Sequence, residues 1–443
     1  MPQPRPKIAK TVDSRFSLNP GSLQCPPTRG PEDRCGIYLK AFHKGETNVN
    51  MKTILKTSVA AAALMALAAP AMATIENGQA KVKLKVYGHV NKAMLWGDDG
   101  NTSRAMVVDG QASSTRLGFL AEAPVNADFS FGANLEMEWR SNQGSAVAIN
   151  NGNAQTSNSG NLDNAQGTNS FTERKAEVML DHKRFGKISL GQGDEASQDA
   201  TEYNLSGATL ATGVLNATGY LVNTALFNNT TKAYTTTTLG ATFGNIDGDR
   251  DDRVRYDTPK IMGFTGSASF TSGGGGAVAL KYDDKIGQFK LLGAVAYNND
   301  AGISTTVEDE VMGSIAVLHD SGLNAHFTAA VRNHKKSVGT DIATDDATWI
   351  GGGVGYIAKI FGVGPTAFAV DYYKTENLNR ANNANTTTEW KVTTFGIGVQ
   401  QGFSDIGTDV YLSYRNFDID QNVNVGSSYD DVNVVVAGVR VQF

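Results

Sequence analysis

The sequence has little of what stabilises a small secreted protein or a helical membrane protein. Its 443 residues include two Cys and eleven Pro, and 40% of them are hydrophobic. Mean hydropathy is −0.26, which excludes a bundle of membrane-spanning helices, because each such helix needs about 20 apolar residues. Lys and Arg (39) do not exceed Asp and Glu (44), so the charge indicates no nucleic-acid partner.

One short apolar run, 59–69, has the layout of a secretory signal. Lys52 and Lys56 precede it, and Ala71-Met72-Ala73 follows it as a cleavage box of small residues. The run is too short to span a bilayer. We therefore predict a signal peptide over residues 51–73, with cleavage after Ala73.

Residues 1–50 precede this signal and lack the marks of a folded domain. They hold seven of the eleven Pro and both Cys, Cys25 and Cys35, with scattered charge. Such a composition does not support a packed core. We interpret Met51 as the true start and residues 1–50 as a non-native extension from an over-extended start; a functional N-terminal domain is the alternative.

The chain from Thr74 onward has no Cys and three Pro. The first 73 residues carry 10 of the 39 basic and 4 of the 44 acidic residues, which leaves 29 and 40 and a net charge of −11. A long exported chain without Cys is not held together by disulfides. Backbone pairing or a large core must hold it.

Alternation of apolar and polar residues replaces helical periodicity in this part. In 129–140, Phe, Ala, Leu, Met and Trp alternate with polar and charged residues, and 323–332 and 410–415 follow the same pattern. The polar face carries Glu and Arg in mid-strand. This suits a water-filled interior better than the packed core of a sandwich or propeller.

Clusters of Gly, Asn, Asp and Ser divide the pattern into sixteen strands. Short turns such as 184–186 and 321–322 alternate with longer polar loops such as 142–170 and 333–347. This layout is typical of an outer-membrane barrel. We therefore predict an all-β, transmembrane, antiparallel β-barrel over residues 74–443, because closure pairs every strand edge in lipid. The chain ends on Phe443, which suits an interfacial aromatic girdle.

Several motifs in this chain resemble those of Gram-negative general porins, of the alphaproteobacterial type. They are STRLGF at 114–119, FGKISLGQGD at 185–194 and RVRYDTP at 253–259, together with Tyr87-Gly88-His89 and the terminal Phe443. Their order and spacing carry the resemblance. It implies a homotrimeric, sixteen-stranded, water-filled channel for small hydrophilic solutes and ions in the lipid of the Gram-negative outer membrane. It also implies that the barrel assembly machinery recognises Phe443.

In that family the third loop folds into the lumen, and its acids face basic residues on the wall. The segment 194–250 is the candidate inward loop here, and a solvated outer loop is the alternative. Its candidate constriction acids are Asp194, Glu195, Asp199 and Glu202. The wall candidates with inward strand parity are Arg116, Arg140, Arg253 and Arg255. On the fourth strand the family pattern favours Arg174, whereas parity favours Lys175, because Arg174 would share a face with apolar residues.

Other chemistry has weaker support. Asp247, Asp249 and Asp251 alternate like the start of a calcium loop, but Asp252 and Thr258 stand where an EF-hand needs Gly and Glu. We therefore predict no cofactor and no metal site; a looser Ca²⁺ site built from these loop carboxylates is the alternative.

A passive diffusion channel is the leading functional interpretation, and the net charge of −11 weakly favours cations. A substrate-selective channel is its close variant. The alternatives from other classes are an adhesin that uses loop 142–170 and a barrel enzyme. An enzyme would need His326 beside a lumenal hydroxyl, and no pattern places one there.

Overall fold

The computed structural model describes residues 73–76, 82–150, 170–302, 304–335, 346–378, 389–421 and 428–443. Residues 1–50 with both Cys, most of the predicted signal peptide and Ala71 lie outside the described residues. Ala73 is the first residue of a short strand, β1 (Ala73–Glu76).

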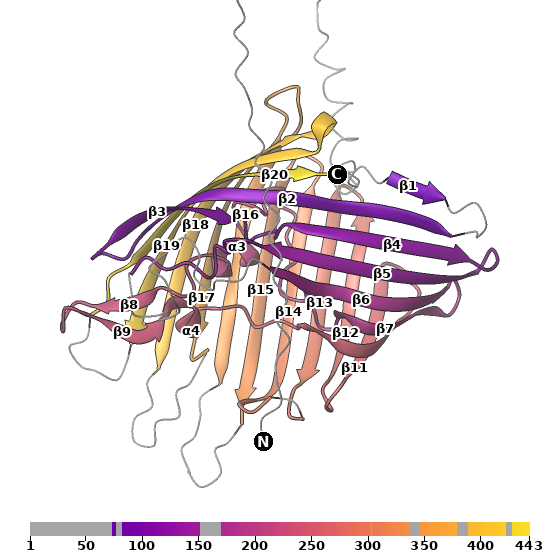
Figure 1. Cartoon of the computed structure of the whole chain (residues 1–443), viewed down its shortest axis with the longest axis horizontal. Coiled ribbons are helices and arrows are strands. Elements are labelled where there is room, and N and C mark those ends of the chain that lie inside the picture. Colours follow the sequence, from indigo (N-terminus) through magenta and orange to yellow (C-terminus); the bar gives the residue numbers. More distant parts are fainter. Residues whose placement is uncertain are drawn as a thin grey trace, which may run out of the picture. The chain divides into compact units, whose positions relative to one another are not determined.

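Sixteen strands form one closed antiparallel barrel, which confirms the predicted fold (Figure 1). They are β2 (Lys83–Asp98), β4 (Arg116–Pro124), β5 (Phe129–Arg140), β6 (Ser170–His182), β7 (Gly186–Asp194), β10 (Arg250–Asp257), β11 (Phe264–Thr271), β12 (Gly276–Ile286), β13 (Phe289–Asn299), β14 (Val307–His319), β15 (Leu323–His334), β16 (Ala347–Ala358), β17 (Thr366–Glu376), β18 (Trp390–Phe403), β19 (Thr408–Gln421) and β20 (Val432–Gln442). A 3₁₀ turn, η1 (Ser404–Ile406), joins β18 to β19.

The first and last barrel strands pair with each other and close the barrel. Residues 89–98 of β2 pair with 433–442 of β20. The backbones of Gly88 and Phe443 exchange two hydrogen bonds of 3.0 and 3.1 Å. A Cβ atom at Gly88 would lie 2.9 Å from the Phe443 ring, so the aromatic terminus packs directly on this glycine at the seam.

The second strand of the barrel is interrupted. Residues 83–89 of β2 pair with β4, whereas residues 92–98 pair with a separate strand, β3 (Ser103–Asp109). The connection 110–115 leaves the wall, and the amide of Gln111 donates to the hydroxyl of Tyr220. This interruption lets the wall contact the segment inside the barrel.

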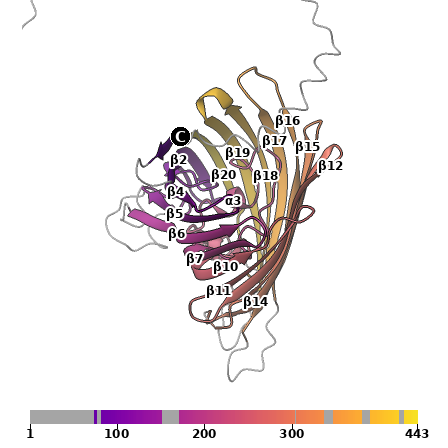
Figure 2. The ribbon, with the colours of Figure 1, turned by 90° about the vertical axis from the view of Figure 1, so that its right-hand side faces the viewer.

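The chain between β7 and β10, residues 195–249, is called the inward segment below. It contains the helices α3 (Val214–Thr218) and α4 (Leu239–Thr242) and the hairpin of β8 (Ala225–Asn228) and β9 (Ala233–Thr238). Much of it packs on the inner face of the barrel, and its β8–β9 hairpin contacts the loop residues Asp99, Thr102 and Asp430 at one mouth. Figure 2 shows α3 between opposite sides of the barrel. No helix in the described ranges is long and apolar enough to cross a membrane.

The outer face of the barrel is apolar, as alternation predicts. Phe131, Leu135 and Trp139 of β5 are about half exposed. Aromatic side chains pair near both strand ends: Phe129 contacts Phe131 at one end, and Trp139 contacts Phe171 at the other. These rows match the aromatic girdles of membrane barrels.

The inner face differs from the expected polar lining over much of its circumference. Trp349 of β16 and Tyr373 of β17 point inward, are buried and stack at 5.0 Å. Phe243 of the inward segment lies 5.5 Å from Trp349. Small apolar residues of β12–β15 join the same buried cluster. The inner wall is apolar there because the inward segment covers it. Strand alternation therefore identifies the inner face, but it does not show which part of that face contacts water.

Candidate functional site

Charged side chains form a continuous ladder across the inner faces of β4, β5 and β6. Arg174 Nε lies 2.6 Å from Glu136 Oε1, and Arg174 Nη1 lies 3.3 Å from Glu138 Oε2. Arg116 Nη1 lies 3.8 Å from Glu136, and Arg140 Nε lies 3.4 Å from Glu138. Arg174 therefore sits between both glutamates, whereas Arg116 has one distant acidic partner.

A β-bulge explains why strand parity and the family pattern favour different residues on β6. Glu136 pairs with Lys175, but the next residue, Met137, pairs with Glu173, so Arg174 is the extra residue. An inserted residue shifts the alternation by one. Arg174 and Lys175 therefore both contact lumenal acids, and Glu173 points outward.

Two basic residues bracket Asp194 where the inward segment begins. Lys175 Nζ bonds to Asp194 Oδ2, and Arg250 Nε lies 2.8 Å from Asp194 Oδ1. Asp194 is thus neutralised by cations from β6 and β10. It links the charge ladder to the entrance of the inward segment.

Arg253 and Arg255 hold the backbone of that entrance. Arg253 donates to the carbonyls of Gly191 (2.8 Å) and Asp194 (3.0 Å), and Arg255 donates to the carbonyl of Glu195 (2.8 Å). Arg253 also pairs with Glu177 at 2.6 Å and is 3% exposed. Both side chains are inward, as parity predicts, but their donors are occupied by protein groups.

Glu195, the second candidate constriction acid, is buried. Its side chain is 4% exposed. Burial, together with the charge of Asp300, raises the pKa of Glu195 to about 7. Near neutral pH this carboxyl is therefore partly protonated.

Three carboxyls of the inward segment gather in one place. The oxygens of Asp199, Glu202 and Asp247 lie within 4.8 Å of one another. Burial raises the pKa of Asp247 to about 7, and burial with the charge of Asp247 raises the pKa of Glu202. The positive charges of Arg250 and Arg174 act on Glu202 in the opposite direction, so this acid cluster lies within electrostatic range of the basic wall.

The fold separates the three aspartates of the calcium-like pattern, Asp247, Asp249 and Asp251. Asp247 joins Asp199 and Glu202, and its oxygens accept the amides of Asp199 (2.9 Å) and Thr201 (3.1 Å). Asp249 and Asp251 do not belong to this cluster. Among the described residues, the carboxyls that could hold a hard cation such as Ca²⁺ are therefore those of the acid cluster.

A second anchor fixes the middle of the inward segment to the far wall. Asp371 of β17 accepts the amide of Gly213 at 2.5 Å and pairs with Arg415 of β19 at 2.8 Å. The amide of Leu210 donates to Gln400 Oε1 of β18 at 3.1 Å. The inward segment is thus fastened at its start and at its middle, on opposite sides of the barrel.

His326 points inward, as parity predicts, but it is 8% exposed. Its Nε2 lies 2.9 Å from the hydroxyl of Tyr373, beside the aromatic stack that Phe243 covers. Its immediate polar partner is therefore a buried tyrosine of the wall.

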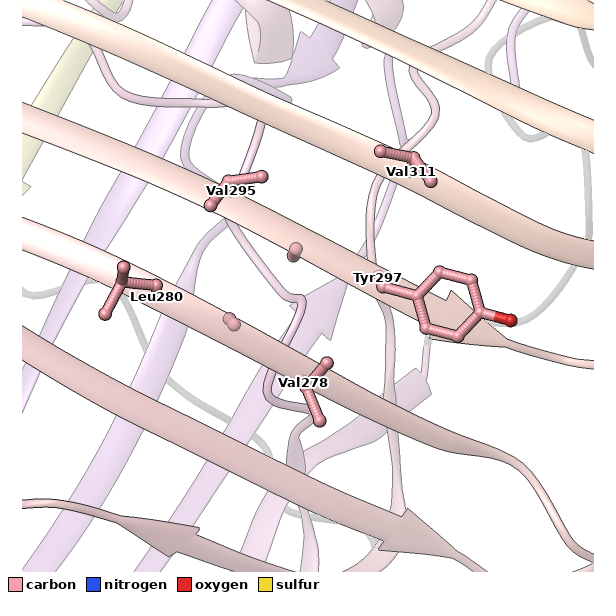
Figure 3. A pocket seen from close by; sticks show the side chains of 7 residues that line it. Val278, Leu280, Val295, Tyr297 and Val311 are labelled. Carbon is pink, nitrogen blue, oxygen red and sulfur yellow. The ribbon is translucent and has the colours of Figure 1, made fainter.

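An apolar groove lies outside the channel, on the outer face of β12, β13 and β14 (Figure 3). Its labelled side chains are Val278, Leu280, Val295, Tyr297 and Val311. Charge is absent from these residues. The groove belongs to the lipid-facing surface of the barrel.

Comparisons with known proteins agree with this architecture. A family model described as Gram-negative porin matches residues 60–422. The anion-selective porin from Comamonas acidovorans is 17% identical, with a TM-score of 0.52, over 82% of this chain and 100% of that chain. OmpT, an outer-membrane protein of Vibrio cholerae, is 12% identical, with a TM-score of 0.51, over 84% and 99%. These structures share the fold. Curated protein sequences give no match.

Proposed function

Because the chain belongs to the Gram-negative porin family, and is therefore an outer-membrane channel, we propose that it is a passive diffusion channel for small hydrophilic solutes and ions. We further propose that its constriction lies between the charge ladder of β4–β6 and the acid cluster of the inward segment. The ion pairs of Asp194, at the entrance of the inward segment, with Lys175 and Arg250 of the wall carry this proposal, and the charges of Arg174 and Arg250 also act on Glu202.

This arrangement supports selection by charge and dipole. The basic groups Arg116, Arg174 and Arg250 come from the wall, and the acids Asp199, Glu202 and Asp247 come from the segment in front of it. Opposite charges on two sides of a narrow pore create a transverse field, which orders water and selects solutes by size and dipole. Asp194, Arg253 and Arg255 support the constriction by holding the entrance of the segment.

Single-channel current through refolded chain 74–443 in a planar bilayer tests the channel. We expect open, ohmic steps, and a salt gradient gives the ion preference from the reversal potential. A folded barrel that passes no current would contradict the proposal.

We expect Arg116→Gln to move the ion preference toward cations. Removing one unit charge about 6 Å from an ion changes the ion's energy by about 0.7 kcal/mol at the dielectric constant of water, or about threefold in the permeability ratio. The reversal potential measures this ratio. The matched control is Arg332→Gln, which removes an inner-wall arginine paired with Glu310 at 2.5 Å, away from the ladder. An equal shift in both variants would place the selecting charges elsewhere.

Cation preference should increase as pH rises from about 5.5 to 8. An acid whose pKa is raised to about 7 is protonated below that pH and negative above it, and Asp247 is such a group. The raised pKa also makes the folded segment less stable as pH rises toward about 7. In this range the folded state binds more protons at Asp247 than the unfolded state does, so raising the pH favours unfolding.

Reversal potentials measured across this pH range test the expectation. Glu202→Gln should reduce the change in reversal potential between the two ends of the range. Asp128→Asn, in an exposed short turn, should leave it unchanged. An equal pH-dependent change of reversal potential in both variants would contradict a role for the acid cluster.

Three further parts of the proposal concern assembly and export. We propose a homotrimer, recognition of Phe443 by the barrel assembly machinery, and removal of residues 51–73 by cleavage after Ala73, with residues 1–50 not translated. Sedimentation in detergent tests the trimer. Intact mass of the precursor from a processing-deficient host tests the start and the cleavage site.

A further inference from the structure

One large hydrophobic side chain is exposed inside the barrel. Leu215 of α3 is 43% exposed. In the described ranges, the other exposed large hydrophobic residues lie on outward-facing strand positions, in the turns that join strands or at the C-terminus. Leu210 and Leu221, which flank α3 in the sequence, are 1% and 0% exposed. Leu215 thus differs from the apolar residues around it, which are packed away from water.

The attachment of α3 to the wall leaves Leu215 on the side that faces the interior space. Val214, Asn216 and Ala217 are buried. Asn216 Oδ1 accepts a hydrogen bond from Arg415 Nε of β19 at 3.4 Å. Figure 2 shows α3 between opposite sides of the barrel. Since the buried residues of α3 face the wall, the exposed Leu215 borders the open part of the lumen.

The C-terminal end of α3 touches the connection that leads to the charge ladder. The carbonyl oxygen of Leu215 and the Cβ atom of Gln111 lie 2.5 and 2.8 Å from the position that a Cβ atom of Gly219 would take. Gln111 belongs to the connection 110–115, which continues into Arg116 at the start of β4. The Arg116 guanidinium folds back onto this connection, because it donates to the carbonyl and the hydroxyl two residues earlier, at 3.1 and 3.3 Å. Leu215 and Arg116 therefore flank the same short stretch of the inner wall.

Arg116 retains positive charge that its neighbours do not neutralise. Three arginines of the ladder share Glu136 and Glu138, so one cation is in excess. Arg174 takes Glu136 at 2.6 Å, whereas Arg116 Nη1 lies 3.8 Å from it and makes no hydrogen bond to the described residues. The Arg116 side chain is 22% exposed. It can therefore donate to a carboxylate in the lumen.

We propose that Arg116 and Leu215 are the two sides of a path for organic carboxylates with an apolar body. The carboxylate pairs with the guanidinium of Arg116, while the apolar body covers Leu215 and removes both apolar surfaces from water. The path rests on the proposed channel function and names the solute class that it favours. Covering about 25 Å² of apolar surface corresponds to about a threefold preference over a polar anion of the same size and charge.

Benzoate and nicotinate are a matched pair of probes for this path. They share charge, size and shape at about pH 8, where both carboxyls are ionised, and they differ at one ring position, a CH group or a nitrogen. Purified channels in a planar bilayer are given the benzoate salt on one side and the nicotinate salt on the other, with the same bulky cation on both sides. The reversal potential then reports the permeability ratio of the two anions. We expect benzoate to be about threefold more permeant, and equal permeabilities would overturn the proposal.

Two substitutions at Leu215 should move this ratio in opposite directions. Leu215→Gln keeps the length and helix propensity of the side chain and removes its apolar end, so the preference for benzoate should disappear. Leu215→Phe enlarges the apolar surface, so the preference should increase. Val125→Thr is the control, because Val125 is 57% exposed in the short turn after β4, and the ratio should not change. The same ratio in the parent and all these variants would show that Leu215 does not touch the solute.

Arg116→Gln tests the charged side of the path. In gradients of each potassium salt, this variant should lower the permeabilities of benzoate and nicotinate relative to potassium by a similar factor, because the two anions carry the same charge. Unchanged anion permeabilities would overturn the role of Arg116. A channel that conducts potassium chloride but neither organic anion would overturn the path and leave the proposed channel function intact. A folded barrel without any current would overturn that function itself.

Discussion

Replacing Arg253 with methionine should destabilise the folded barrel by about 3–5 kcal/mol, because it leaves a buried charge without its partner. Arg253 Nη2 lies 2.6 Å from Glu177 Oε2, with side-chain exposures of 3% and 8%. The variant also removes the donors to the carbonyls of Gly191 and Asp194. The free energy of unfolding, from urea titration of the refolded chain followed by tryptophan fluorescence, measures the loss.

The matched control is Arg440→Met. Arg440 pairs with Asp409 at 2.7 Å, but these side chains are 18% and 15% exposed. Water screens such a pair better, so the expected loss is at most about 1 kcal/mol. Equal losses in the two variants would show that Arg253 has no special role at the entrance of the inward segment.

Replacing Asp371 with alanine should lower the free energy of unfolding by a similar amount and also change the open-channel current. Arg415 is 3% exposed and would lose its carboxylate, at a cost of about 3–5 kcal/mol. The amide of Gly213 would lose its acceptor, so the middle of the inward segment would be released from the wall. We expect increased noise in the open-channel current, which single-channel recording measures.

A double variant separates the loss of charge pairing from the loss of packing. Asp371→Leu combined with Arg415→Met replaces both charges with apolar groups, which is often neutral or stabilising for a buried pair. We expect the free energy of unfolding to recover while the current noise persists, because Gly213 still lacks its acceptor. Quiet channels in the double variant would mean that Asp371 does not hold the segment in place.

The sequence predicts the outer face of the barrel well because one physical rule governs it. Lipid requires apolar side chains at every second position, and 129–139 of β5 follow that rule in the structure. The inner face has no comparable rule. Trp349 and Tyr373 lie on the inner face, yet they are buried, because a segment from elsewhere in the chain packs beside them.

For charged residues, too, the sequence predicts the face of the barrel better than it predicts the role of the side chain. Parity places Arg116 and Arg253 on the inner face, but it does not distinguish an arginine near the solute path from one whose donors are all used to hold backbone. Parity favours Lys175 over Arg174, but a bulge breaks the alternation and both side chains contact lumenal acids. The alternation of apolar and polar residues does not reveal an inserted residue. The expectation for Arg174 came from the resemblance to Gram-negative porins.

The apolar packing of the inward segment has a consequence for the order of events during folding. Its residues contact β17 and β18, which are synthesised after it, and its Tyr220 contacts the connection that follows β3. The surfaces that bury it therefore come from both ends of the chain, and they meet when β20 pairs with β2. Contacts so distant in sequence form slowly. Sealing of the seam and burial of the segment should thus occur as one late, cooperative step.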